Sequence, residues 1–170
     1  MMTLGIVSLI FGAAFCGFYM AHLYEKRYKQ LADFLHGIQI FETELMYGHT
    51  PLHEAFQIVS EQTDPAVSKL FADFSEKLQD KEVQVESAWR TILETHEPYM
   101  AFSKADCAVL YRLAEGLGKH DLLTEQKQLQ NFMLHLQMQC EKAKEKVEKE
   151  SKMVRSLGVL IGLLFVIILV

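Results

Sequence analysis

Charge is missing from both ends of this 170-residue sequence. No charged side chain precedes Glu25 and none follows Arg155. The uncharged run from Thr3 to Tyr24 would be about 33 Å long as an α-helix, which is enough to span a bilayer. It lacks the basic start and the small-residue cleavage site of a secretory signal, so we expect an uncleaved transmembrane anchor over residues 1–24.

The other uncharged run is the C-terminal one, from Leu157 to Val170. It is short for a membrane span, but it lengthens to Met153 if the flanking Lys152 and Arg155 side chains reach back to the headgroups. We expect a second anchor over residues 153–170. The charged segment between the anchors, residues 25–152, is then the functional domain.

Cysteine is scarce as well, with Cys16, Cys107 and Cys140 far apart and no CxxC pair. This spacing argues against a disulfide framework. Reduced, buried thiols fit a domain in the cytoplasm.

The three prolines, Pro51, Pro65 and Pro98, all fall at or between the ends of predicted helices. Pro51 and Pro65 are predicted as first helical residues, the latter after Asp64 as N-cap, and Pro98 lies in a connector. Ser103 with Asp106 forms a weak capping box for the next helix.

Apolar residues recur with the period of an α-helix throughout, and no segment has the alternation of a strand. We therefore predict an all-α fold, a membrane-anchored bundle of about six helices whose first and last helices continue into the anchors. Trp89, the single tryptophan, is predicted to be a core residue. The predicted core-facing residues include Leu31, Phe34, Leu35, Ile38, Phe41, Leu45, Leu52, Ala55, Phe56, Val59, Val67, Leu70, Phe71, Phe74, Leu78, Val85, Ala88, Ile92, Leu93, Cys107, Leu110, Tyr111, Ala114, Leu122, Leu129, Phe132, Met133, Leu136, Cys140, Ala143 and Val147.

Basic residues gather beside both anchors. Lys26, Arg27 and Lys29 follow the first, and Lys142, Lys144, Lys146, Lys149, Lys152 and Arg155 precede the second. The interval 30–140 holds eight basic and seventeen acidic residues, a net charge of −9. By the positive-inside rule the domain faces the cytoplasm of a two-span protein of the cell membrane. An acidic centre without a basic stripe argues against nucleic-acid binding.

Catalytic and cofactor motifs are absent. No serine sits in a nucleophile elbow and no glycine-rich loop follows a strand, so we expect no enzyme activity and no cofactor. The acidic residues are expected on solvated helix faces. The alternative is a membrane-anchored metal-dependent enzyme or regulator that uses His49 and His53, although HTPLHE is not HExxH and a third ligand is missing.

Two predicted turns stand out between the helices. Gly48 ends the first helix and Pro51 follows, and Gly116 and Gly118 form a corner before a helix that opens at Asp121. We interpret these glycines and Pro51 as structural. The exposed residues beside them are candidate partner contacts, namely Tyr47, His49 and Glu54.

Small residues occur four positions apart in both anchors, at Gly12 with Ser8 and Cys16, and at Gly158 and Gly162. On a helix they share one face and allow close helix packing in a membrane. Ordinary glycine enrichment of membrane helices explains the same pattern.

The segment from Glu44 to Ala55, ELMYGHTPLHEA, resembles the signature of the stage III sporulation protein AB family. The Gly116–Gly118 turn before a helix bearing Gln126, and Arg155 to Gly158 before an apolar end, resemble it too. A wider similarity is to the helical domains of the inner-membrane platform protein of type II secretion and type IV pili. That protein has a duplicated domain and three anchors, whereas this chain has one domain and two anchors.

The resemblance implies a platform subunit of a secretion-like channel complex between mother cell and forespore. It implies a location in the mother-cell membrane around the forespore, with the domain facing the cytoplasm. The implied partners are a stage III sporulation protein AA-like ATPase and other membrane proteins of the same operon.

Overall fold

The computed structural model describes the backbone of residues 2–48, 50–80, 82–115, 117 and 122–169, and the side chains of residues 19–48, 50–80, 82–115, 117, 124–150 and 153. Across these residues the chain forms six α-helices, one π-helical turn and two 3₁₀ segments, without a strand. The all-α prediction is therefore confirmed. The elements are α1 (Met2–Thr43), η1 (Glu44–Gly48), α2 (Leu52–Glu61), α3 (Pro65–Leu78), α4 (Val85–His96), η2 (Glu97–Tyr99), α5 (Lys104–Leu110), η3 (Tyr111–Glu115) and α6 (Leu122–Leu169).

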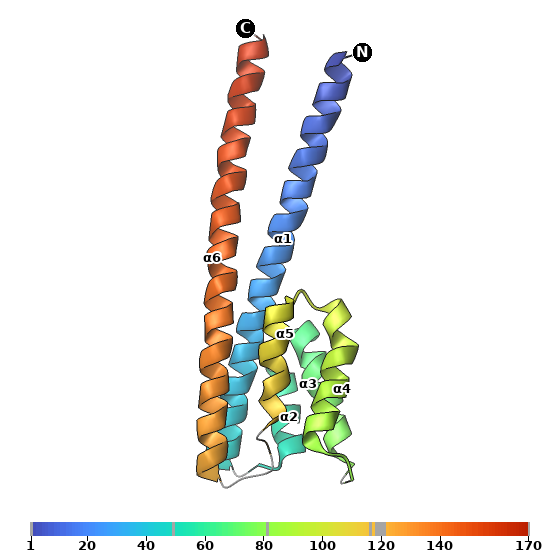
Figure 1. Ribbon diagram of the computed structural model, residues 1–170, viewed down its shortest axis with the longest axis vertical. Coiled ribbons are helices and arrows are strands. Elements are labelled where there is room, and N and C mark those ends of the chain that lie inside the picture. The colour runs from blue at the N-terminus through green and yellow to red at the C-terminus, as the bar shows by residue number, and fades with distance from the viewer. Residues whose placement is uncertain (1, 49, 81, 116, 118–121, 170) are drawn as a thin grey trace.

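The two long helices, α1 and α6, run antiparallel and project together from one end of the bundle (Figure 1). Two contacts fix their register: the Gln130 amide donates to Glu42 Oε1 at 3.4 Å, and Lys146 Nζ lies 5.7 Å from the centre of the Tyr24 ring. Each is one unbroken helix that extends past the bundle.

Aromatic rings form the centre of the bundle. Phe41 and Phe56 stack with ring centres 4.3 Å apart, and Phe74 meets Trp89 edge to face at 4.9 Å. Trp89 is fully buried and its indole N–H donates to the Leu110 carbonyl at 2.7 Å, so its predicted core position is confirmed. Such buried aromatics contribute several kcal/mol each, about 3–5 by truncation to alanine.

Gly37 allows α1 to approach α2 and α3 closely. A Cβ atom at this position would lie 2.9 Å from Val59 Cγ1, 3.0 Å from Phe71 Cε2 and 3.1 Å from Thr63 Cγ2. These distances are shorter than ordinary van der Waals contact, so the packing of the three helices depends on a missing side chain.

The bundle has two different ends (Figure 1). At the stem end α1 and α6 leave the bundle, α3 begins, and a connector over residues 97–103 joins α4 to α5. The opposite end is the turn end. Three elements finish there, namely η1, α3 and η3, and three helices begin there, namely α2, α4 and α6. Sequence-distant segments meet at each end because the short helices run back and forth between them.

Several local predictions need correction. Pro51 is the residue before α2 and not its first residue, since its ψ of 146° is extended. Asp64 does precede Pro65 at the start of α3, but its side chain makes no capping bond, and its backbone N–H donates to Asp33 Oδ2 at 2.9 Å instead. The helix after Ser103 tightens to 3₁₀ geometry from Tyr111 onward.

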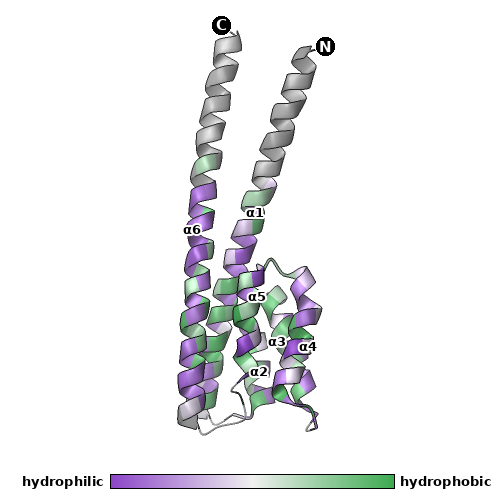
Figure 2. Cartoon of the chain, in the orientation of Figure 1, coloured by the Kyte–Doolittle hydropathy of each residue, from purple (hydrophilic) through white to green (hydrophobic). Residues whose placement is uncertain are grey.

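The predicted anchors, residues 1–24 and 153–170, lie outside the described side chains except for residues 19–24 and Met153. Among the residues that were described, none of the helices has the length and apolarity needed to cross a membrane. Figure 2 shows that hydrophobic residues gather inside the bundle, while the part of α6 that extends beyond it is mostly hydrophilic up to Met153.

Candidate functional site

The turn end is built around η1, where α1 widens into a single π-helical turn. Thr50 closes this turn twice: its backbone N–H donates to the Glu44 carbonyl at 3.4 Å, and its hydroxyl donates to Glu44 Oε2 at 3.0 Å. A side chain at Gly48 would place a Cβ atom 2.6 Å from Thr50 Oγ1. Single π-helical turns of this kind occur frequently at functional sites.

Leu45 and Tyr47, two positions apart in η1, lie on opposite sides of the turn. Leu45 is buried, whereas Tyr47 is 83% exposed. Glu54, in the first turn of α2, has a side chain that is 60% exposed, and Nε2 of the adjacent His53 lies 3.7 Å from its Oε1. Two of the three predicted contact residues, Tyr47 and Glu54, are thus exposed at the same end of the bundle.

Other predicted site residues fall outside the described part of the structure. His49, Gly116 and Gly118 are among the undescribed residues, and Gly12, Gly158 and Gly162 belong to the helix segments whose side chains are not described. Of the two histidines of the metal alternative, His49 thus lies outside the described residues, whereas His53 is described. In the part of the chain that the structure describes, no three His, Cys, Asp or Glu side chains are grouped closely enough to bind a metal ion.

A groove of about 340 Å³ opens at the turn end between η3 and the first turns of α6. Its polar lining includes Arg112, Glu115 and His135, and its apolar lining includes Leu113 and Phe132. Exposed acidic residues surround this end of the bundle, and three basic side chains, Lys77, Arg112 and Lys127, are exposed there among the described residues. The acidic ones are Glu54, Glu76, Asp80, Glu82 and Glu115.

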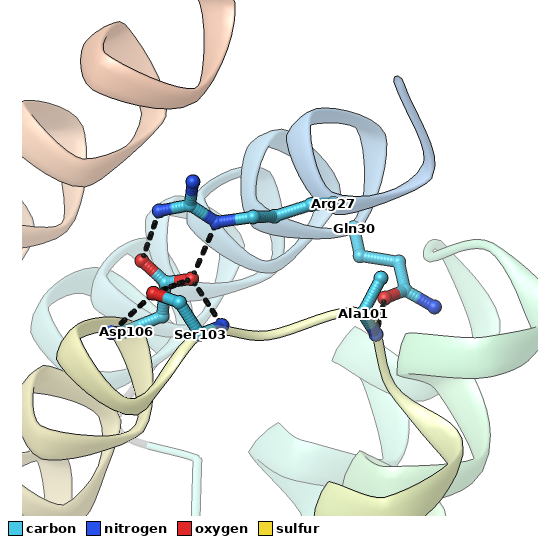
Figure 3. Close-up of polar contacts among 5 residues, drawn as sticks. All are labelled: Arg27, Gln30, Ala101, Ser103 and Asp106. Carbon is cyan, nitrogen blue, oxygen red and sulfur yellow. Dashed lines mark hydrogen bonds and ion pairs between the residues drawn. The ribbon is translucent and has the colours of Figure 1, made fainter. Parts of the chain in front are cut away.

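The stem end holds a buried ion pair that was not predicted from the sequence (Figure 3). Arg27 on α1 donates to Asp106 on α5 through Nε at 2.7 Å and Nη2 at 2.9 Å. The backbone N–H and hydroxyl of Ser103 donate to the same carboxylate at 2.7 and 2.8 Å, and the Asp106 N–H donates back to Ser103 Oγ. The predicted capping box is confirmed, and Arg27 completes it.

The environment of this pair favours its charged form. Burial alone would raise the pKa of Asp106, but the hydrogen bonds from Arg27 and Ser103 outweigh it and hold that pKa below its ordinary value. The hydrogen bond from Arg27 to Asp106 correspondingly raises the pKa of the arginine.

The expectation that acidic residues lie on solvated faces is wrong for Asp106, which is 0% exposed, and for Glu125, which is 6% exposed.

A second polar contact fixes the neighbouring connector. The side-chain carbonyl of the buried Gln30, one turn along α1 from Arg27, accepts a hydrogen bond from the Ala101 N–H at 2.7 Å (Figure 3). Together with the hydrogen bonds that join Arg27, Asp106 and Ser103, it ties the second half of the 97–103 connector to α1. The two thiols near this region, Cys107 and Cys140, are free and buried, and burial raises their pKa values to about 12 and about 11.

The sequence carried a signal for these contacts. Arg27 precedes Leu31 by four positions and Phe34 by seven, so it lies on the apolar face of α1 and not on a solvated one. Gln30 precedes Phe34 by four positions and Gly37 follows it by three, so both share that face. Arg27 was predicted only as a basic residue beside the first anchor, whereas its side chain is buried in the bundle.

The fold and its two ends define a class: a helical domain carried on a stem of two antiparallel helices, with an exposed acidic surface at the end away from the stem. A family model described as stage III sporulation protein AB matches residues 2–170. The stage III sporulation protein AB of Bacillus subtilis (strain 168) is 35% identical over 166 residues, which cover 98% of this chain and 97% of that protein.

The solved structures give the same result. A chain described as stage III sporulation protein AB (SpoIIIAB) superposes with a TM-score of 0.68 at 32% identity, covering 72% of this chain and 97% of that one. The protein therefore belongs to the stage III sporulation protein AB family, which implies a role in sporulation.

Proposed function

We propose that this protein is a non-enzymatic platform subunit of a secretion-like complex between mother cell and forespore. Its uncharged terminal segments anchor it in the mother-cell membrane around the forespore, and the bundle faces the cytoplasm. The proposed cytoplasmic partner is a stage III sporulation protein AA-like ATPase, with other membrane proteins of the same operon beside the anchors.

One observation supports this proposal most directly: Tyr47 and the acidic residues around Glu54 lie at the turn end, opposite the end from which α1 and α6 project. If the stem leads into the membrane, the turn end is the part of the domain that reaches farthest into the cytoplasm. An aromatic residue that is 83% exposed is costly in water and is a common anchor of protein interfaces. The acidic surroundings favour a partner with a basic surface.

Photocrosslinking tests the docking surface. A benzophenone amino acid replaces Tyr47 in the full-length protein, and the cells are irradiated during sporulation. Tyr99 is the matched control, because it is the same residue type, is 80% exposed and lies at the stem end. We expect the ATPase to be crosslinked from position 47 and not from position 99. Equal yields, or no ATPase adduct at position 47, would contradict docking at the turn end.

Cysteine labelling tests the topology. Gln79 is exposed at the turn end, so Gln79→Cys should react with a membrane-impermeant maleimide only after the cytoplasmic side is opened. Labelling of intact cells would place the bundle on the other side of the membrane and would remove the basis for docking a cytoplasmic ATPase.

A further inference from the structure

The stem formed by α1 and α6 exposes large apolar side chains that the bundle does not cover. On α1, Tyr19 is 59% exposed and Met20 is 45% exposed, and on α6 Met153 is 51% exposed. These three residues are called the stem patch below. The two helices draw apart toward their free ends (Figure 1). Exposed apolar side chains that gather among polar ones mark an interaction surface.

The residues of the stem patch lie at nearly the same height on the two helices. Lys146 on α6 lies beside Tyr24 on α1, and the helices are antiparallel. Tyr19 comes five residues before Tyr24, so α6 reaches its level five residues after Lys146. Met153 is two residues further on, or about 3 Å along the helix axis. Both helices therefore contribute to one level of the stem.

Lipid chains do not fit as the cover of this patch. Glu148 and Lys149 are exposed on α6 at the level of the uncharged run of α1, and Lys152 and Arg155 follow them in the sequence. Charged side chains are costly in the hydrocarbon of a bilayer. If the uncharged ends enter a membrane, the hydrocarbon begins beyond Arg155, and the stem patch lies between it and the bundle.

The charges beside the stem patch are of both signs. The interval 141–152 of α6 holds five lysines and four glutamates, a net charge of +1. Lys144, Glu145 and Lys149 are exposed, and none of them forms an ion pair with another residue that the structure describes. A surface with both signs is complementary to a copy of itself. The turn end is different, because acidic residues outnumber basic ones there and two copies would repel each other.

We propose that the stem patch is the contact surface for a second copy of this chain, with α1 of each copy packed against α6 of the other. Two copies anchored in the same membrane present the patch at the same height. A two-fold axis parallel to the stem then brings Tyr19 of each copy to Met153 of the other, so the same contact forms twice. The alignment of the two copies rests on the membrane anchoring proposed above.

Cross-linking between two differently tagged full-length copies tests the contact. Both are produced in the membrane of a bacterium that does not sporulate, so other sporulation proteins are absent. Cys16→Ser is introduced in both copies, while Cys107 and Cys140 stay because they are buried. One copy carries Tyr19→Cys and the other Met153→Cys. We expect a short bismaleimide to join the two tags in one product.

A cysteine on another face of α6 is the matched control. Glu148 is exposed and lies five positions before Met153, which places it about 140° around the helix at a similar height. Tyr19→Cys in one copy and Glu148→Cys in the other should give much less product. Equal yields from the two pairs would mean random collision in the membrane, and the proposed contact would be wrong.

Co-purification of the two tags measures the contact without introduced cysteines. Tyr19→Ala with Met20→Ala should reduce co-purification about tenfold, which is the effect of losing one well-buried apolar contact. Leu134→Ala with Met138→Ala is the control, because these residues are also exposed on the long helices, at 58% and 46%, but lie beside the bundle. An equal loss in both variants would contradict a contact at the stem patch.

Photocrosslinking in sporulating cells identifies what covers the patch. A benzophenone amino acid at position 19 should give a product of twice the mass of the chain. A product with a different protein, or with lipid alone, overturns the second copy as the occupant. Membrane fractionation is read separately: protein that stays in the membrane without a dimer overturns this inference only, and a dimer that is not retained in the membrane overturns the anchoring but not the contact.

Discussion

Arg27 and Asp106 are separated by 79 positions in the sequence and joined by two hydrogen bonds, of 2.7 and 2.9 Å. The arginine belongs to the long helix α1 and the aspartate to the short helix α5. Both side chains are withdrawn from water, with exposures of 11% and 0%. The pair links α1 to α5 at the stem end, where α1 leaves the bundle.

Removing one partner of this pair should destabilise the protein strongly. Asp106→Ala leaves the buried guanidinium of Arg27 without a counter-charge, so we expect unfolding to become easier by about 3–5 kcal/mol. Denaturant unfolding of the full-length protein in mild detergent, followed by circular dichroism, measures the change. Lys29→Ala, which breaks the exposed pair with Glu25, is the control and should have little effect. Equal effects of the two substitutions would show that the buried pair does not stabilise the fold.

The same pair makes stability depend on pH at the acidic end. The pKa of Asp106 is lower in the folded protein than its ordinary value of 3.8. Its contribution to stability is therefore complete above that value and is lost as the pH falls through the lower, folded-state pKa. We expect the difference in unfolding free energy between wild type and Asp106→Asn to shrink as the pH is lowered below 3.8. A difference that stays constant at low pH would contradict the assignment.

Gly37 should not tolerate even one extra methyl group. Gly37→Ala gains about 1 kcal/mol of helix propensity but places Cβ 2.9 Å from Val59 Cγ1, and overpacking of this kind costs about 1–3 kcal/mol. The ring of Phe71, 3.0 Å away, is held in the aromatic core and has little room to yield. We expect a lower melting temperature for Gly37→Ala.

Shortening a facing side chain provides the control for this clash. Val59→Ala alone should destabilise, because it leaves a cavity, but the double variant Gly37→Ala with Val59→Ala should be more stable than the sum of the two single effects. Simple additivity in the double-mutant cycle would argue against steric contact between these two positions.

The described thiols should be inert in the folded protein. Burial raises the pKa of Cys107 to about 12 and that of Cys140 to about 11, so almost no thiolate exists at neutral pH. In a Cys16→Ser variant we expect no reaction with Ellman's reagent until denaturant is added, after which two thiols should react. Rapid reaction of either thiol under native conditions would show that the α1, α5 and α6 contacts open readily.

The sequence by itself determined the helices, because helical periodicity and the positions of proline and glycine act locally. Leu31, Phe34, Ile38 and Phe41 repeat at intervals of three and four, and all four are buried. The Ser103 and Asp106 capping box was readable for the same reason, since its members are three residues apart. The family signature ELMYGHTPLHEA was also legible in the sequence.

Only the tertiary structure decided which distant residues meet. The pairing of Arg27 with Asp106, the contact of Gln30 with Ala101 and the close approach of Val59 to Gly37 each join segments far apart in the sequence. Helical periodicity places a residue on a face but does not say which helix lies opposite. The crossing positions and registers of the helices determine which helix lies opposite. They depend on how the side chains of the whole core pack together. The same packing sets Tyr47 and Tyr99 at opposite ends of the bundle, although in the sequence both are simply tyrosines beside a helix end.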